Sequence, residues 1–318
     1  MFSNFPLLLA PMEDITDSPF RTLCKIHGAD ILCSEFIASD GLIRMVGKSL
    51  DKIRFLPEER PYGVQIFGNN PDVMAEAAQI VASYKPDFID MNFGCPVKKV
   101  VTKGGGAALL NEIPRMLAIA KAVVQSVNLP VTAKTRLGWD AKSVVIETLA
   151  EQLQDTGIKA LSIHARTKAQ LYAGIADWSA IGAVKNNPRI HIPIFGNGDI
   201  DSPQKAAAYK NTYGVDGIMI GRASIGNPWL FNHVKHYLAT GQLLPEPSLN
   251  ERIDACIRLV HLASQNPDGP HNLLKLRRHY SGFFKSLPNF KPYRLKLVTS
   301  TDVIEITDVL SEIRHQYA

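Results

Sequence analysis

The chain has 318 residues, of which 46% are hydrophobic and 20% charged, and its net charge at pH 7 is +5. This length and composition are typical of a globular protein with one large domain and a smaller one, and they exclude a disordered or low-complexity chain. No segment approaches the roughly 18 apolar residues that a membrane span requires, so we expect no membrane association.

The four cysteines, Cys24, Cys33, Cys95 and Cys256, are widely spaced and form no C-x-x-C pair. This spacing argues against a zinc or iron–sulfur site and against a disulfide framework, and it is typical of a reducing compartment. The apolar run at 7–10 is too short for a secretion signal. We therefore expect a cytoplasmic protein that binds no metal.

Short, continuous apolar runs recur along the first three-quarters of the chain, with helical segments between most of them. Such runs are typical of parallel strands that are covered on both faces. The expected strands are Leu7–Pro11, Ile31–Phe36, Tyr62–Gly68, Phe88–Cys95, Val131–Gly138, Ala160–Thr167, Pro193–Ile200 and Gly217–Ser224. Eight strands alternating with helices over about 230 residues match an α/β fold of the (β/α)8 TIM-barrel type. A doubly wound open sheet is the alternative, but no G-x-G-x-x-G follows the first strand.

Capping residues followed by proline mark several helix starts, because serine and asparagine cap helices and proline suits the first turn. These pairs are Ser18-Pro19, Asn70-Pro71, Ser202-Pro203 and Asn227-Pro228. The two prolines of 244–248 interrupt any helix and indicate a linker. Beyond it, helical signals continue, and Asp302 with Glu305 suggests a capping box. We expect a TIM-barrel domain over 1–241 and a small helical domain over 246–318.

One cysteine, Cys95, follows a buried strand in the segment Met91-Asn92-Phe93-Gly94-Cys95-Pro96. Active sites of TIM barrels lie at the carboxyl ends of the strands, where a thiol can donate a proton to a reacting carbon. The basic stretch from Lys98 can attract a polyanion, and the glycines at 104–106 let backbone approach a ligand closely. Taken alone, Cys95 fits a small buried apolar residue, and the glycines fit a flexible turn. The neighbours of Cys95 favour the proton donor.

Further residues, most of them polar, gather at the other predicted strand ends, which is unusual for buried positions. They are Pro11, Met12, Glu35, Gln65, Lys134, Arg136, His164, Arg166, Asn197, Gly198, Asp199, Gly221 and Arg222. The last two strands end in 196–199 and 221–222, where TIM barrels commonly hold phosphate. Lys134 and His164 indicate a conjugated, partly anionic ring, and phosphate plus ring favours flavin mononucleotide (FMN). Loop-orienting roles for Glu35 and Gln65, and a core role for His164, stay open.

A basic stretch lies in the second domain, from Lys275 to Lys296. It contains no acidic residue and seven cations: Lys275, Arg277, Arg278, Lys285, Lys291, Arg294 and Lys296. Clustered cations neutralise phosphates, so the stretch favours nucleic acid as a partner. The interleaved aromatics fit the core of the helical domain better than stacking on bases.

The chain resembles the tRNA-dihydrouridine synthases, and among them the bacterial B-type enzymes. The resemblance rests on motifs that follow one another along the whole barrel. They are Leu9-Ala10-Pro11-Met12, Val64-Gln65-Ile66, Asp90-Met91-Asn92-Phe93-Gly94-Cys95-Pro96, Lys134-Thr135-Arg136-Leu137-Gly138-Trp139, Ile163-His164-Ala165-Arg166-Thr167, Gly196-Asn197-Gly198-Asp199-Ile200 and Met219-Ile220-Gly221-Arg222-Ala223. The helical domain agrees in position and basic character but is less diagnostic.

The resemblance implies an FMN enzyme that uses NADPH to reduce the carbon 5–carbon 6 double bond of particular uridines in tRNA, with Cys95 as the proton donor. It assigns FMN binding to Pro11, Met12, Gln65, Lys134, His164, Arg166, Asn197, Gly198, Asp199, Gly221 and Arg222. It assigns Asn92 to orienting the uracil or the flavin edge, and we add Arg136, Lys98, Lys275, Arg277 and Arg278 as tRNA contacts. Glu13 departs from the family pattern, in which a small residue follows Pro-Met. We expect a monomer.

Two other functions stay open at this stage. An FMN barrel of the dihydroorotate dehydrogenase kind would act on a free pyrimidine and would not need a basic helical domain. A tRNA-binding protein or folding chaperone that has lost turnover would not need the intact set of Cys95, Lys134 and Arg222.

Overall fold

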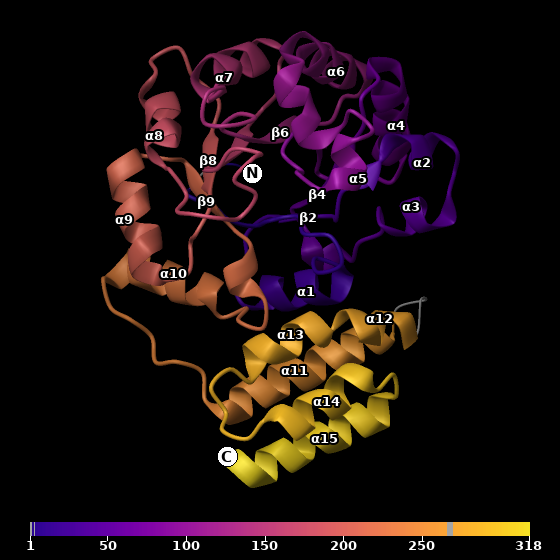
Figure 1. Ribbon diagram of the computed structural model, residues 1–318, viewed down its shortest axis with the longest axis vertical. Helices are drawn as coiled ribbons and strands as arrows, with labels where there is room; N and C mark the ends of the chain where they lie inside the picture. Colours follow the sequence, from indigo (N-terminus) through magenta and orange to yellow (C-terminus); the bar gives the residue numbers. More distant parts are fainter. Residues whose placement is uncertain (1, 3, 266–269) are drawn as a thin grey trace.

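The computed structural model describes residues 2, 4–265 and 270–318. At its centre, parallel strands follow the order β1-β9-β8-β7-β6-β5-β4-β2, and β3 also pairs with β4. A parallel bridge between Leu8 and Ile31 completes the ring. The strands are β1 Leu7–Leu9, β2 Leu32–Cys33, β3 Ile37–Ala38, β4 Tyr62–Phe67, β5 Phe88–Asn92, β6 Val131–Arg136, β7 Leu161–His164, β8 Ile194–Asn197 and β9 Gly217–Ile220. The predicted TIM barrel followed by helices is confirmed (Figure 1).

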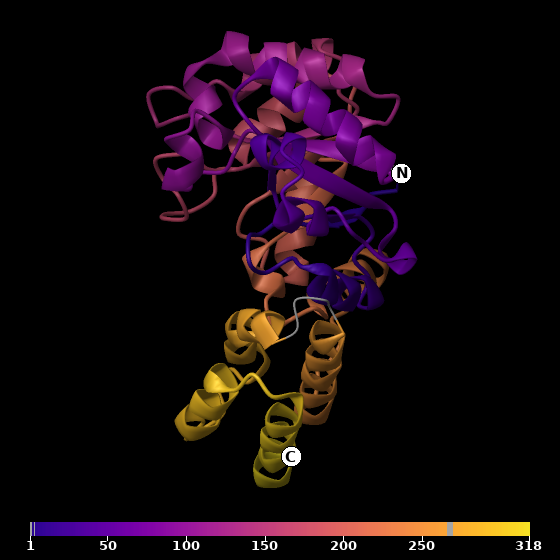
Figure 2. The ribbon, with the colours of Figure 1, turned by 90° about the vertical axis from the view of Figure 1, so that its right-hand side faces the viewer.

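The helices up to α10 cover the outside of the barrel, and the five after it form a separate lobe (Figures 1 and 2). The first group is α1 Ser18–Ile26, α2 Ser39–Ile43, α3 Gly47–Asp51, α4 Pro71–Ser83, α5 Lys98–Val101, α6 Ile113–Ser126, α7 Ile146–Asp155, α8 Ser179–Asn186, α9 Pro203–Tyr213 and α10 Leu230–Thr240. The lobe contains α11 Leu249–Ser264, α12 Pro270–Lys275, α13 Arg277–Phe283, α14 Lys291–Thr299 and α15 Val303–Tyr317. No helix of the described residues is long and apolar enough to cross a membrane.

The second predicted strand, Ile31–Phe36, is wrong in detail. The structure divides this region into β2 and β3, and both pair with β4. Between them, the Ser34 hydroxyl accepts a hydrogen bond from the backbone amide of Gln65 at 2.9 Å. This bond interrupts the regular ladder beside β4, and Glu35 follows it outside the strands.

The helix starts expected from capping pairs are confirmed at two of the four positions. Asn70 caps α4, and Ser202 caps α9. For α1 the capping residue is Asp17 rather than Ser18, because the Asp17 carboxylate accepts from the Phe20 amide. The helix expected at Asn227-Pro228 begins at Leu230 without a side-chain cap.

Close packing holds the helical lobe against the barrel. His279 of α13 is buried, and its ring lies 4.3 Å from the ring of Phe20 in α1. The backbones meet at Gly226, where an added Cβ would lie 2.5 Å from the His279 carbonyl oxygen and 2.6 Å from the Cα of Gly282. Gly226 also has φ +65°, which favours glycine. The carboxyl end of the barrel and the lobe are therefore fixed close to each other.

Candidate active site

A cavity of about 370 Å³ opens at the carboxyl ends of β1, β8 and β9. Nine of the eleven residues assigned to FMN line it: Pro11, Met12, Lys134, His164, Asn197, Gly198, Asp199, Gly221 and Arg222. Gln65 and Arg166 are not among the lining residues. Polar residues from strands far apart in the sequence thus converge on one cavity, as expected for parallel strands whose carboxyl ends share one face.

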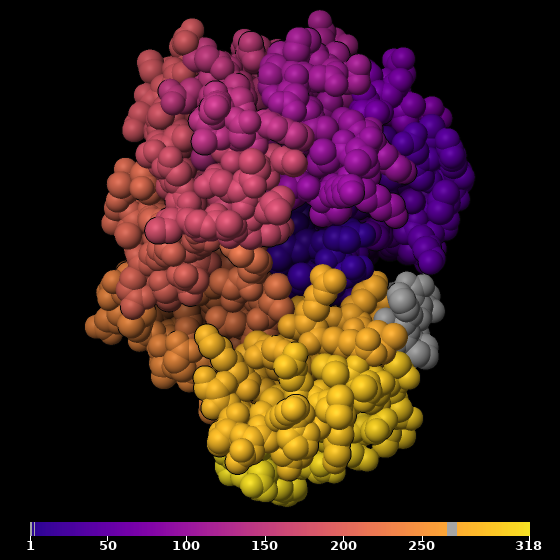
Figure 3. Space-filling view, in the orientation of Figure 1, coloured from indigo at the N-terminus to yellow at the C-terminus, as the bar shows by residue number. Residues whose placement is uncertain are grey.

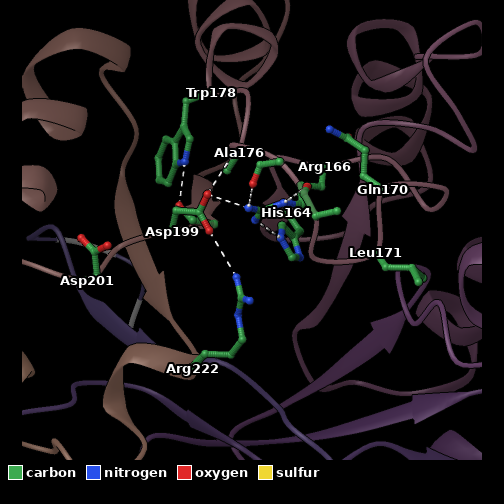
Figure 4. Close-up of polar contacts among 12 residues, drawn as sticks. His164, Arg166, Gln170, Leu171, Ala176, Trp178, Asp199, Asp201 and Arg222 are labelled. Carbon is green, nitrogen blue, oxygen red and sulfur yellow. Dashed lines mark hydrogen bonds and ion pairs between the residues drawn. The ribbon is translucent and has the colours of Figure 1, made fainter.

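Asp199 joins two arginines at the edge of this cavity (Figure 4). Its carboxylate accepts from Arg166 Nη2 at 2.7 Å and from Arg222 Nη2 at 3.2 Å, and the Ala176 amide donates to it at 2.9 Å. Burial alone would raise the pKa of Asp199, but these hydrogen bonds and the arginine charges outweigh it, so the pKa lies below its usual value. The ionised carboxylate holds Arg222 beside the cavity.

Arg166 is 2% exposed, and it organises the loop after β7 instead of lining the cavity. Its guanidinium donates to the carbonyl oxygens of Ala173 and Gly174 at 3.1 and 2.6 Å. This loop carries Tyr172, whose ring lies 4.7 Å from the Cζ atom of Arg222. Arg166 therefore fixes the position of an aromatic cavity wall.

Lys134 of β6 and His164 at the end of β7 both line the cavity. Lys134 Nζ donates to Asn197 Oδ1 at 3.2 Å, and Asn197 Nδ2 donates to the Met219 carbonyl at 2.8 Å. Burial, and then the nearby Arg136, lower the pKa of Lys134 to about 8. Burial and the surrounding cations hold the pKa of His164 far below its usual value, so its imidazole is neutral.

A chain of hydrogen bonds connects three strands to the cysteine. Asp90 accepts from Thr132 Oγ1 and, at 2.6 Å, from Gln65 Nε2. The other end of the Gln65 amide, Oε1, accepts from Asn92 Nδ2 at 2.8 Å. Asn92 Oδ1 in turn accepts from the amides of Gly94 and Cys95 at 3.1 and 2.8 Å. Because each amide has one donating and one accepting end, the Asp90 carboxylate sets the orientation of Gln65, of Asn92 and of the loop bearing Cys95.

Cys95 is a free thiol, 8% exposed, and follows β5 by three residues. Burial raises the pKa of Cys95, so the thiol keeps its proton at neutral pH. Arg136 Nε donates to the Gly94 carbonyl at 2.8 Å and supports the loop. An added Cβ on Gly106 would lie 2.8 Å from the Cys95 carbonyl oxygen and 3.2 Å from its Cβ. The last of the three glycines thus packs against the cysteine itself.

The residues predicted to contact tRNA lie at three separate places. Asn92 and Arg136 belong to the buried network around Cys95, and Lys98 is exposed at the start of α5. Lys275 lines a larger cavity between the barrel and the lobe, and Arg277 and Arg278 are exposed on α13.

The basic stretch is partly neutralised by acids from elsewhere in the chain. Arg278 lies 3.7 Å from a carboxylate oxygen of Asp14, and Lys296 lies 2.9 Å from Glu312. Its aromatics Tyr280, Phe283 and Phe284 are buried, as expected for core residues.

Two residues of this site were missed in the sequence. Asp90 lies within the apolar run of β5, where a polar residue was the available signal. Tyr172 stands in an irregular loop, and its ring lies 6.2 Å from the ring of His164 and 5.6 Å from the Cζ of Arg136. Nothing in the local sequence pattern of that loop marks the tyrosine as a cavity residue.

The barrel and the polar cavity at the carboxyl ends of its strands define a TIM-barrel enzyme. A family model described as "Dihydrouridine synthase (Dus)" matches residues 8–316. The chain therefore belongs to the dihydrouridine synthase family.

Curated relatives extend over most of the chain. The tRNA-dihydrouridine synthase B of Xanthomonas campestris is 41% identical over 288 residues, which cover 91% of this chain and 86% of the relative. The tRNA-dihydrouridine synthase B of Pseudomonas aeruginosa is 41% identical over 292 residues, with the same coverage. A probable tRNA-dihydrouridine synthase of Rickettsia bellii is 36% identical and covers 96% of this chain and 94% of its own length.

Solved structures show the fold at low sequence identity. Morphinone reductase matches with a TM-score of 0.52 and 12% identity, over 78% of this chain and 88% of its own. Histamine dehydrogenase from Rhizobium sp. 4-9 matches with a TM-score of 0.59 and 11% identity. That match covers 99% of this chain but only 63% of the histamine dehydrogenase chain.

Proposed function

We propose that this protein is an FMN-dependent tRNA-dihydrouridine synthase that reduces the carbon 5–carbon 6 double bond of uridines in tRNA, with NADPH as the reductant. The family match and the names of the relatives support the reaction class. The observation that carries the proposal is a protonated, oriented thiol, Cys95, in a TIM barrel whose neighbouring strand ends form a polar cavity lined by Lys134 and Arg222. We assign the catalytic role to residues 1–241 and tRNA binding to residues 246–318.

The cavity residues fit FMN by their chemistry. Arg222 and the backbone around Gly198 and Gly221 provide cationic and amide donors for a phosphate group. Met12 and Pro11 offer an apolar wall, while Lys134 and Asn197 offer polar contacts for a heteroaromatic ring. The neutral imidazole of His164 suits a hydrogen bond to such a ring without adding a second charge. When bound, FMN reduced by NADPH supplies the hydride for carbon 6 of the uracil.

Cys95 completes the reduction by giving its proton to carbon 5. The thiol becomes a thiolate, so one hydride and one proton add across the double bond. The raised pKa of Cys95 keeps the donor protonated before the reaction. The neighbouring charges of Arg136 and Lys134 lower its pKa relative to burial alone, and they stabilise the thiolate that forms.

Arg136 and Asn92 are the side chains that we assign to uracil. Arg136 donates from Nε to the Gly94 carbonyl and from Nη1 to the carbonyls of Thr167 and Leu171. Its Nη2 therefore stays available for a uracil oxygen. Asn92 Oδ1 accepts from two backbone amides, and Asn92 Nδ2 donates one hydrogen to Gln65. Its role is therefore mainly to position Cys95, with one hydrogen left for the substrate.

The first experiment is the visible absorbance spectrum of the purified protein, with mass analysis of any molecule released by heating. Flavin bands and the mass of FMN are expected. A dihydrouridine assay then compares a tRNA transcript with free uridine monophosphate under NADPH. Product from the free pyrimidine alone would support the dihydroorotate dehydrogenase-like alternative. A colourless protein that takes up no added FMN would overturn the oxidoreductase assignment and favour the tRNA-binding protein.

A further inference from the structure

A second cavity, of about 1190 Å³, lies between the barrel and the helical lobe. The segment 13–22 after β1 and the segment 35–41 around β3 line it from the barrel side. Asn272 and Lys275 of α12 line it from the lobe. Figure 3 shows a hollow here, with N-terminal residues in indigo at its floor. The cavity is separate from the one that we assign to FMN, since the two share no lining residue.

Buried polar atoms without a hydrogen-bond partner gather in this cavity. Among the residues that the structure describes, such atoms include Glu13 Oε2, Thr22 Oγ1, Glu35 Oε1 and Asn272 Nδ2, and all four residues line it. A buried polar group without a hydrogen-bond partner destabilises the folded protein. Acceptors on the barrel and a donor on the lobe therefore suggest a polar ligand that bridges the two.

Glu35 is the group with the strongest need for a partner. It is 4% exposed, and Lys52 Nζ lies 3.9 Å from its Oε2, beyond hydrogen-bond distance. Lys52 instead donates to Glu13 Oε1. One lysine thus faces two carboxylates, and a buried carboxylate needs hydrogen-bond donors. A ligand that pairs with Glu35 would therefore bring N–H or O–H groups.

At the rim of the cavity, exposed cations outnumber exposed acids, whereas the buried Glu35 lies at its floor. The exposed cations are Arg44, Lys48, Arg54, Lys99 and Lys103, and the exposed acids are Asp14, Asp40 and Asp51. A free amine or polyamine would meet repulsion from these cations. A nucleotide satisfies both regions, because its phosphate suits the rim and an amino group on its base suits the floor.

We infer that Glu35, with Glu13 beside it, binds the exocyclic amino group of an adenine, cytosine or guanine in the RNA substrate. The base donates N–H to Glu35, and a ring nitrogen or carbonyl oxygen of the base accepts from Asn272. Rim cations hold the adjoining phosphates. This inference rests on the proposed function, and it adds a nucleotide other than the reduced uridine, because uracil has no amino group.

The direction in which a charge-removing substitution changes the affinity for tRNA tests the inference. Glu35→Gln removes a negative charge, which by simple electrostatics tightens the binding of a polyanion. If the carboxylate accepts hydrogen bonds from a base, the same change weakens tRNA binding by about ten-fold, measured as Kd by filter binding. Asp40→Asn is the matched control, because it removes an exposed charge from a residue that lines the same cavity. We expect equal or tighter binding there. Equal or tighter binding by Glu35→Gln would overturn the inference.

Short RNAs identify the base chemistry. Wild-type protein should bind hexacytidylate and hexaadenylate more tightly than hexauridylate in fluorescence anisotropy, and Glu35→Gln should reduce that ratio towards one. An unchanged ratio in the variant would overturn the inference. Cytidine monophosphate as a competitor distinguishes a free nucleotide site from an RNA site. Strong competition at micromolar concentration would contradict binding as part of the RNA chain.

Failure of the inference and failure of the proposed function are distinguishable. FMN content and flavin reduction by NADPH are measured for each variant and should match the wild type, and a cooperative melting transition shows that each variant is folded. Wild-type protein that forms no dihydrouridine would overturn the proposed function. The ratio of affinities for hexacytidylate or hexaadenylate and for hexauridylate would still decide whether Glu35 binds an amino group.

Discussion

Polar side chains are arranged differently at the carboxyl end of the barrel and in the helical lobe. At the barrel end, buried polar side chains from β4 to β8 are tied into networks, such as the chain from Thr132 through Asp90 and Gln65 to Asn92. In the lobe, the core is mostly apolar and most of the cations are exposed, with scattered ion pairs such as Lys296 with Glu312. Preorganised buried networks suit chemistry that needs fixed atoms, while exposed charges suit a polyanion that slides and adjusts. Single substitutions should therefore have large effects at the barrel end and small, salt-dependent ones in the lobe.

The largest effect is expected at Cys95. Cys95→Ala removes the proton donor and should lower the rate of dihydrouridine formation by roughly a hundredfold to ten-thousandfold, with FMN retained. The rate is measured by single turnover of the reduced enzyme on a tRNA transcript. Cys256→Ala in α11 is the control, since it truncates another buried cysteine in the lobe. Wild-type turnover by Cys95→Ala would remove this residue from the mechanism.

Asp90 comes next, because it sets the orientation of the amides that hold the Cys95 loop. Asp90→Leu leaves Gln65 Nε2 without its acceptor and should lower kcat by about a hundredfold. Asp90→Asn retains one oxygen that can accept from Gln65 and should recover most of that loss. Equal rates for the two variants would show that the orientation of Gln65 does not matter. Flavin content and melting temperature separate this effect from unfolding.

Arg222 tests the phosphate end of the proposed FMN site. Arg222→Ala removes a cation at the cavity and should raise the Kd for FMN by about ten-fold or more, measured by flavin fluorescence during dialysis. Arg115→Ala provides the control, because Arg115 is an exposed arginine on α6 that pairs with Glu112 at 3.2 Å. Unchanged FMN retention in the Arg222 variant would place the phosphate elsewhere.

A smaller effect is expected from charge reversal in the lobe. Arg277→Glu should weaken tRNA binding several-fold and reduce the slope of log Kd against log salt by about one unit. Arg278 is less suitable, because its pairing with Asp14 and the Glu13 carbonyl couples charge to the contact with the barrel. Lys121→Glu on α6 gives the matched reversal on the barrel surface. If both variants share one salt slope, the tRNA does not contact α13 at Arg277.

The smallest effect on activity is expected at Asp17, where the change acts on stability. Burial, and then Glu35, raise the pKa of Asp17 to about 6. A carboxyl whose folded-state pKa is raised stabilises the fold below its unfolded pKa of about 4, and this contribution disappears as pH rises through about 6. Asp17→Asn keeps the helix cap without the charge. It should raise the free energy of unfolding at pH 7.5, by roughly 3 kcal/mol at most, and far less at pH 4. A pH-independent difference between variant and wild type would contradict this.

The sequence by itself determined the barrel and the ends of its strands. Continuous apolar runs, each followed by polar or glycine residues, require no knowledge of distant contacts, since burial on both faces acts on each strand alone. The same local patterns placed Cys95, Asn197 and Arg222 at strand ends, and parallel strands bring their carboxyl ends to one face. The order of the motifs along the chain was enough to identify the family.

Tertiary structure alone decided which of these residues share a cavity and which support it. Arg166 and Gln65 do not line the cavity; Arg166 bonds a loop carbonyl and Gln65 bonds Asn92, and their assignment to FMN stays a prediction. Asp14 and Glu312 neutralise cations that have no acid near them in the chain. The unpaired oxygen of Glu35 was equally hidden, because hydrogen-bond satisfaction depends on atoms that folding brings together from distant segments.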